Sequence, residues 1–113
     1  MEDHFKYWDR LIKKYCEIED FPDKREAELN IWSNIAVVQY PGTPIDQRVS
    51  IYMNLAMLDW LLVDKGYIQK GESLQHHPAK VSIPPKLMAE IKERMTVQAL
   101  EDGAIHKSEF AEA

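Results

Sequence analysis

Three stretches of the chain repeat their hydrophobic side chains at three- and four-residue intervals, which is the pattern of amphipathic helices. They cover residues 4–18, residues 23–40 and residues 44–65. Aromatic and branched aliphatic residues occupy many of the apolar positions in each stretch. We therefore expect a mainly α fold that begins with a three-helix bundle over residues 1–68.

Residues typical of helix N-termini and C-termini lie between these three stretches. Asp23, with Glu26 three residues later, is typical of a helix N-terminus. Thr43 followed by Pro44 predicts the start of the third helix, because threonine is a good N-cap and proline suits the first helical position. Gly66 predicts the end of that helix as a glycine C-cap, with hydrophobic residues just beyond it.

The third stretch is apolar over most of its circumference. One stripe consists of Val49, Tyr52, Met53, Ala56, Trp60 and Val63, and four leucines widen it. Such a wide apolar surface indicates the central helix of the bundle, with Trp60 in the core. Trp60 also has a second interpretation, because Asp59 and Asp64 flank it and could form the polar rim of an interface.

A polar stretch follows this bundle. Residues 69–79 contain Gly71 and Pro78 and lack an apolar period, so we interpret them as a linker or a surface loop. We place the domain boundary here, between the bundle and a C-terminal module over residues 80–113.

The C-terminal module begins with alternating side chains. Lys80 and Ser82 alternate with Val81 and Ile83, which is the pattern of a half-buried strand. Two prolines then end the strand and suit the start of a helix that closes at Gly103. A single strand needs a partner, and the simplest is the same strand of a second copy across a two-fold axis.

The segments "KVSIP", "PKLMAEIKERM" and "GAIHKSEFAEA" together resemble the ribbon-helix-helix DNA-binding module, over residues 79–113. The resemblance implies one or two helices after the strand and a dimeric transcriptional regulator whose paired strands enter the major groove. It implies that Lys80 and Ser82 face the bases, while Lys107 and Ser108 meet backbone phosphates at a helix N-terminus. The dimer core that it implies consists of Val81, Ile83, Leu87, Ile91 and Phe110.

The same residues allow a second interpretation, in which an extended loop leads to a fourth helix over residues 85–102 and a short tail. The chain would then be a non-enzymatic protein-binding module, such as an inhibitor or immunity-type protein, whose acidic surface contacts a basic partner. The net charge of −5 and the absence of a basic stripe weigh against a nucleic-acid partner. A native chain that continued past Ala113 with helix-forming residues would favour the DNA-binding interpretation.

Candidate chemistry elsewhere is sparse. Cys16 is the only cysteine, its helical setting predicts a buried thiol, and a chain without a disulfide suits the cytoplasm. His76 and His77 are adjacent rather than spaced like metal ligands, so we interpret them as solvated loop residues. No motif for an enzyme or a cofactor is present, and no apolar run is long enough to cross a membrane. We therefore expect no catalysis, no metal or cofactor, and no membrane segment.

Overall fold

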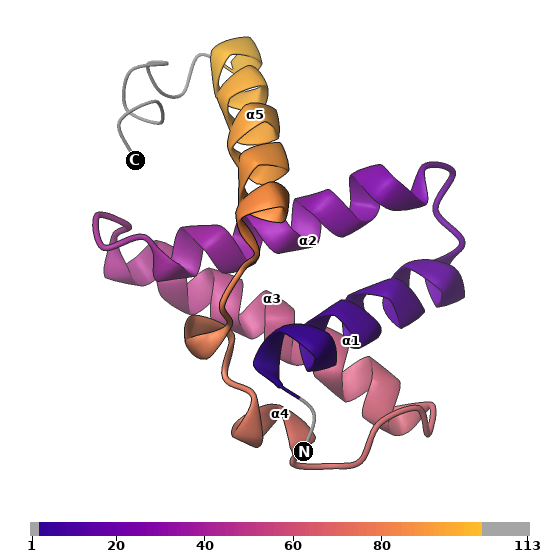
Figure 1. Ribbon diagram of the computed structural model, residues 1–113. Coiled ribbons are helices and arrows are strands. Elements are labelled where there is room, and N and C mark those ends of the chain that lie inside the picture. The colour runs from indigo at the N-terminus through magenta and orange to yellow at the C-terminus, as the bar shows by residue number, and fades with distance from the viewer. Residues whose placement is uncertain (1–2, 103–113) are drawn as a thin grey trace. The chain divides into compact units, whose positions relative to one another are not determined.

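The structure, a computed structural model, describes residues 3–102, and all regular structure among them is helical (Figure 1). The chain divides into two compact units, Met1–Ser82 and Ile83–Ala113. The elements of the first unit are α1 (His4–Glu19), α2 (Lys24–Gln39), α3 (Ile45–Asp64), α4 (Glu72–Gln75) and the 3-10 helix η1 (Pro78–Lys80). The second unit contains α5 (Pro85–Asp102). The mainly α fold expected from the sequence is confirmed.

Two of the predicted helix ends are confirmed. The Asp23 side chain accepts a hydrogen bond from the backbone N–H of Glu26 at 3.0 Å, which caps the N-terminus of α2. At the end of α3, Gly66 has a positive φ of 83°, which glycine adopts at no steric cost. The backbone N–H of Tyr67 then reaches back to the Leu62 carbonyl at 2.9 Å, as in a Schellman motif.

The predicted N-cap of α3 is wrong. Thr43 makes no cap, since α3 begins at Ile45 and its N-cap residue is Pro44, whose side chain has no acceptor. The Thr43 hydroxyl donates instead to the Val37 carbonyl at 2.7 Å, which also accepts from the backbone N–H of Tyr40 at 3.2 Å at the end of α2. Thr43 therefore bonds to the C-terminal end of α2 and does not cap the N-terminus of α3.

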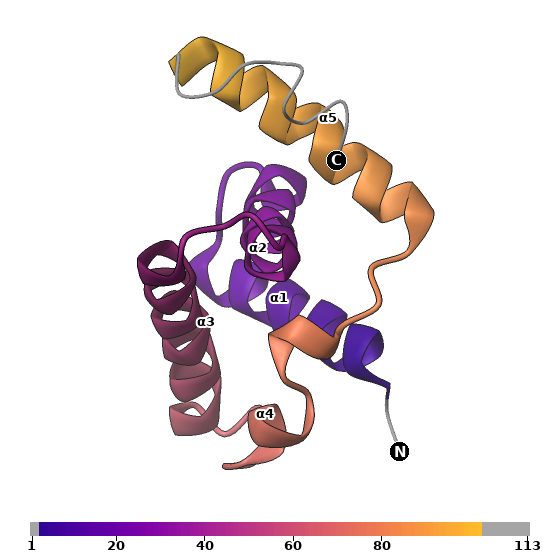
Figure 2. The ribbon, with the colours of Figure 1, turned by 90° about the vertical axis from the view of Figure 1, so that its left-hand side faces the viewer.

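The first unit has its core where α1, α2 and α3 pack against one another, and η1 packs on α1 and α2 (Figures 1 and 2). The side of α1 that faces this core is large and apolar, and the thiol of Cys16 is buried within it, as predicted. The buried residues of α1 are Tyr7, Trp8, Leu11, Ile12 and Cys16.

The prediction that α3 is buried as the central helix is wrong. Its buried residues are Ile51, Leu55 and Leu62, which face α1 and α2 from one side of the helix. Val49, Met53 and Trp60, from the stripe predicted to be the core, are exposed. Because α1 and α2 lie on one side of α3 (Figure 2), these three residues of its other side are left exposed.

The predicted strand near residue 80 is also absent, since the part of the chain that the structure describes contains no strand. Lys80 ends η1, and residues 81–84 have no regular structure. The Gln39 side chain of α2 donates from Nε2 to the carbonyls of Pro78, at 3.0 Å, and Val81, at 2.8 Å. A side chain of the same chain thus holds the backbone here, in place of a partner strand.

In the second unit, α5 begins at Pro85, close to the predicted start. The backbone N–H of Met88 donates to the carbonyl of Pro84 at 2.9 Å, which closes the first turn. The second helix predicted after Gly103 lies outside the described residues. No helix within residues 3–102 is both long enough and apolar enough to cross a membrane.

Candidate functional site

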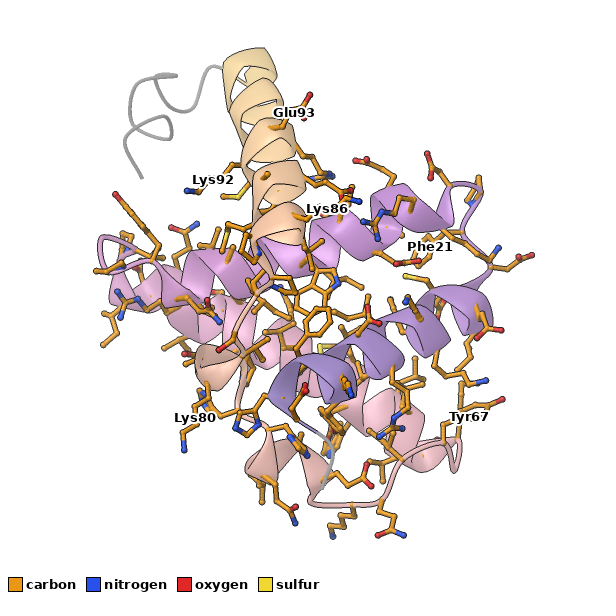
Figure 3. The ribbon with its side chains drawn as sticks, viewed as in Figure 1. Phe21, Tyr67, Lys80, Lys86, Lys92 and Glu93 are labelled. Carbon is orange, nitrogen blue, oxygen red and sulfur yellow. The ribbon has the colours of Figure 1, made fainter. Side chains whose placement is uncertain are left out.

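The residues predicted to read DNA do not form a ribbon in this structure. Lys80 and Ser82 are both exposed, and the Lys80 side chain points away from the neighbouring helices (Figure 3). Val81 is buried and Ile83 is half-buried, but neither lies in a strand. The ribbon-helix-helix resemblance is therefore overturned, because that module depends on a paired strand.

The remaining residues of that prediction lie on α5 or outside the described chain. Leu87 and Ile91, predicted to be dimer core, are buried residues of α5. Lys107, Ser108 and Phe110 lie outside the described residues, so their predicted roles stay predictions.

In two regions of the first unit, the burial of the side chains differs from what the sequence predicted. The first is a largely buried group of polar and aromatic side chains where the N-terminus of α1 meets the segment after α4. We call it the His76 cluster. Its members are His4, Tyr7, Trp8, Asp59 and His76.

His76 is the centre of this cluster and is buried, contrary to the prediction of a solvated loop residue. Its ring stacks on the Tyr7 ring with centroids 4.5 Å apart, and its backbone carbonyl accepts a hydrogen bond from Trp8 Nε1. Its Nδ1 lies 2.9 Å from Nδ1 of His4, so one of these rings must donate the hydrogen and the other accept it. His77, its neighbour, is exposed as predicted.

Tyr7 joins α1 to α3 within the cluster. Its hydroxyl donates to Oδ1 of Asp59 at 3.1 Å. Burial, followed by the negative charge of Asp59, raises the pKa of Tyr7 far above its ordinary value, so the hydroxyl stays protonated. A neutral phenol already engaged with a carboxylate holds two helices together, and it is neither a nucleophile nor a base at neutral pH.

Cys16 is the other group of the first unit whose chemistry was considered from the sequence. Burial raises the pKa of the Cys16 thiol to about 11, with a smaller contribution from Glu28, so little reactive thiolate forms. Among the side chains that the structure describes, those of residues 3–95, no three His, Cys, Asp or Glu come together as a metal site would require. The polar groups of the His76 cluster bond to one another, which is the arrangement of a structural network.

The second region is the solvent side of α3, which we call the outer face of α3. It consists of Ile45, Val49, Met53, Ala56, Met57 and Trp60, all of them exposed. Ile45 and Trp60, at its two ends, are 80% and 78% exposed, and each of the five larger side chains is more than half exposed. Together they make one contiguous exposed apolar patch, and a large patch of this kind on a monomeric protein usually marks an interaction site.

Helical geometry explains why these residues share one side. In the ideal helix, residues 45, 49, 53 and 57 form one row of four-residue steps, and residues 56 and 60 lie in the next row. Positions 51, 55 and 62 fall on the opposite side, where they are buried. The outer face is thus a continuous band that runs along about four turns of α3.

The charges on α3 lie around this band and not within it. Asp46 and Asp64 are exposed at its two ends, and because they are 18 residues apart they point in the same direction. Arg48 is engaged elsewhere, since its guanidinium donates to the carbonyls of Tyr40, at 3.0 Å, and Pro41, at 2.8 Å. Asp59 belongs to the His76 cluster. The band is therefore apolar along its length and acidic at both ends.

Sequence reasoning missed this face, although the signal was present. The apolar residues of α3 cover more of the helix than one contact side can bury, and this excess was interpreted as a central position. The alternative interpretation of Trp60, as a residue near acidic neighbours at an interface, agrees with its exposure. Compared with known proteins, the chain matches no protein-family model, no curated protein and no solved structure.

Proposed function

We propose that the protein is a non-enzymatic binding module that holds a basic partner protein on the outer face of α3. The observation that supports this proposal is the apolar band on that face, with carboxylates at its ends. Large exposed apolar patches with a polar rim mark interaction sites, and tryptophan and methionine are enriched in interface cores. The net charge of −5 suits a basic partner, and a lone buried thiol is compatible with the cytoplasm.

Size also supports a protein as the occupant. A stable interface buries about 800 Å² on each partner, so the band would supply most of the apolar centre and its surroundings would supply the rim. Ser50 and Asn54 lie along one edge of the band and are exposed, where they can form rim hydrogen bonds. Trp60 fits the part of an anchor residue, because buried tryptophans often dominate the binding energy of an interface.

The test is to place a photo-crosslinking amino acid at Met57 in cells of the source organism and to identify the protein that it captures. The same probe at Asn30, an exposed residue of α2, is the positional control. The captured protein is then purified, and its affinity for the wild type is compared with that for Trp60→Ala. Leu74→Ala is the matched control, because Leu74 is also an exposed apolar residue but lies on α4.

We expect the purified partner to be basic, to bind the wild type, and to lose at least tenfold in affinity with Trp60→Ala, with little change for Leu74→Ala. Capture from Met57 and Asn30 alike would contradict the proposal. So would a purified partner that binds Trp60→Ala as tightly as the wild type.

A further inference from the structure

We infer that the occupant of the outer face of α3 is a single amphipathic helix with Lys or Arg near both of its ends, and not a second copy of this chain. This inference rests on the proposed function and specifies the partner of the same surface. It follows from the spacing of the exposed side chains and from the position of the two end carboxylates.

The spacing fits a helix. Met53, Ala56, Met57 and Trp60 stand at positions i, i+3, i+4 and i+7, and all four are exposed. Four residues at this spacing form the hole that receives one side chain of a facing helix. Ala56 makes the floor of this hole low, while the two methionines are flexible enough to fit knobs of different shape.

The length of the band suits one helix along its whole extent. From Ile45 to Trp60 the band rises about 22 Å, at about 1.5 Å per residue. A facing helix of about five turns would cover it and reach both Asp46 and Asp64. Peptides that bind as helices commonly present apolar residues at i, i+3, i+4 and i+7, which is the complement of this surface.

The end charges argue against self-association. If two copies paired their α3 helices in antiparallel fashion along the whole length of Ile45–Asp64, Asp46 of each would lie within one residue of Asp64 of the other. If they paired in parallel, Asp46 would approach Asp46, and Asp64 would approach Asp64. Both arrangements place carboxylates opposite carboxylates, and like charges across an interface select against a partner.

A helix from another protein with Lys or Arg about 18 residues apart removes this conflict and forms an ion pair at each end. Arg48, the cation of α3, lies on the other side of the helix from Asp46, where it donates to the carbonyls of Tyr40 and Pro41. The acidic ends therefore also set the register of the partner helix, since sliding it by one turn, about 5.4 Å, would separate both ion pairs.

The experiment uses a displayed library of 24-residue helical peptides, in which core positions vary among Leu, Ile, Met, Phe and Ala. The first-turn and last-turn positions vary among Lys, Gln and Glu. Selection on the wild-type protein, with Trp60→Ala as the counter-selection, should enrich Lys at both ends. The selected peptides are then measured against wild type, against Asp46→Asn/Asp64→Asn, and in rising salt.

We expect the affinity of selected peptides to fall about three- to tenfold with Asp46→Asn/Asp64→Asn, and the salt dependence to weaken. The asparagine variants should keep the helical circular dichroism of the wild type. The wild-type protein alone should sediment as a monomer at micromolar concentration.

Three results would overturn the inference. One is a selection that yields no binder, or binders without enrichment of Lys at the ends. Another is unchanged affinity in the asparagine variants. The third is a wild-type dimer that dissociates with Met53→Glu, which would make a second copy the occupant. The proposed function fails separately, if the probe at Met57 captures no partner whose binding depends on Trp60.

Discussion

The His76 cluster and the outer face of α3 differ in their residue types and in their burial, and each is the opposite of what its residue types suggest. The cluster contains two histidines, a tyrosine and an aspartate, the residue types of catalytic sites, yet these groups are engaged with one another. The outer face contains residue types of a hydrophobic core, yet it is exposed to solvent. Residue type alone therefore misassigns both regions, and burial together with hydrogen-bond partners assigns them correctly.

The largest expected effect on stability comes from replacing one tryptophan in each region with alanine. Trp8→Ala should lower the free energy of unfolding by about 3–5 kcal/mol, because it removes a fully buried ring. It also leaves the carbonyl of His76 without its donor. Trp60→Ala should change the same quantity by less than about 0.5 kcal/mol, since its side chain is mostly exposed.

Urea unfolding followed by circular dichroism measures both variants against the wild type. Equal destabilisation by Trp8→Ala and Trp60→Ala would mean that the outer face of α3 is packed in the folded protein, and the distinction between the two regions would not hold.

The next effect is an alkaline loss of stability that originates on the buried side of α1. The pKa of the Cys16 thiol is raised from 9.0 to about 11 in the folded protein, so between these values the unfolded chain has lost a proton that the folded chain retains. Stability is therefore unaffected by this group below pH 9 and falls as the pH rises towards 11, by up to about 1.4 kcal/mol per pH unit.

The measurement is the free energy of unfolding of wild type and Cys16→Ala at intervals between pH 8 and pH 11. The alanine variant should show a shallower decline over the upper part of this range, although Tyr7, whose pKa is also raised, contributes a decline in both proteins. Parallel curves would show that the thiol titrates alike in the folded and unfolded chains.

A smaller effect is expected at the hydrogen bond that joins α1 to α3. Tyr7→Phe keeps the ring that stacks on His76 but removes the hydroxyl that donates to Asp59. The loss should be about 1–2 kcal/mol, because the carboxylate loses a donor while the apolar packing stays. Tyr67→Phe, at a half-exposed tyrosine after α3, is the matched control and should change stability by less than about 0.5 kcal/mol. Similar losses of stability in Tyr7→Phe and Tyr67→Phe would show that the hydrogen bond from Tyr7 to Asp59 does not stabilise the fold.

The sequence predicted the long helices because local signals are sufficient for them. Apolar periodicity located α1, α2 and α3, and Asp23 and Gly66 marked ends where the cap is made by neighbouring residues. The strand near residue 80 was predicted wrongly because alternation over four residues also fits an extended segment. The deciding contact comes from Gln39, about 40 positions earlier in the chain.

The two regions could not be assigned from the sequence for the same reason. The partners of His76 are His4, Tyr7 and Trp8, which are about 70 residues away and have no local pattern that links them to it. On α3, periodicity showed that several sides are apolar, but which side is covered depends on where α1 and α2 pack. Tertiary contacts of long sequence separation thus decided both the structural network and the candidate binding face.

The smallest expected effect on stability comes from changes in the outer face of α3. These changes test whether the face serves binding and not folding. Met53→Gln/Met57→Gln makes the centre of the band polar while keeping a long unbranched side chain of good helix propensity at each position. Because both methionines are more than half exposed, the free energy of unfolding should change by less than about 0.5 kcal/mol per site. Binding of the partner should nevertheless fall at least tenfold, since two residues of the hole become polar.

Thermal and urea unfolding measure the free energy of unfolding, and titration with the captured partner measures the binding affinity. A loss of stability well above 1 kcal/mol would indicate that the methionines pack within the folded chain. Unchanged stability with unchanged binding would indicate a partner that contacts another surface. Only a variant that folds like the wild type and fails to bind supports a face that is retained for a partner and not for the fold.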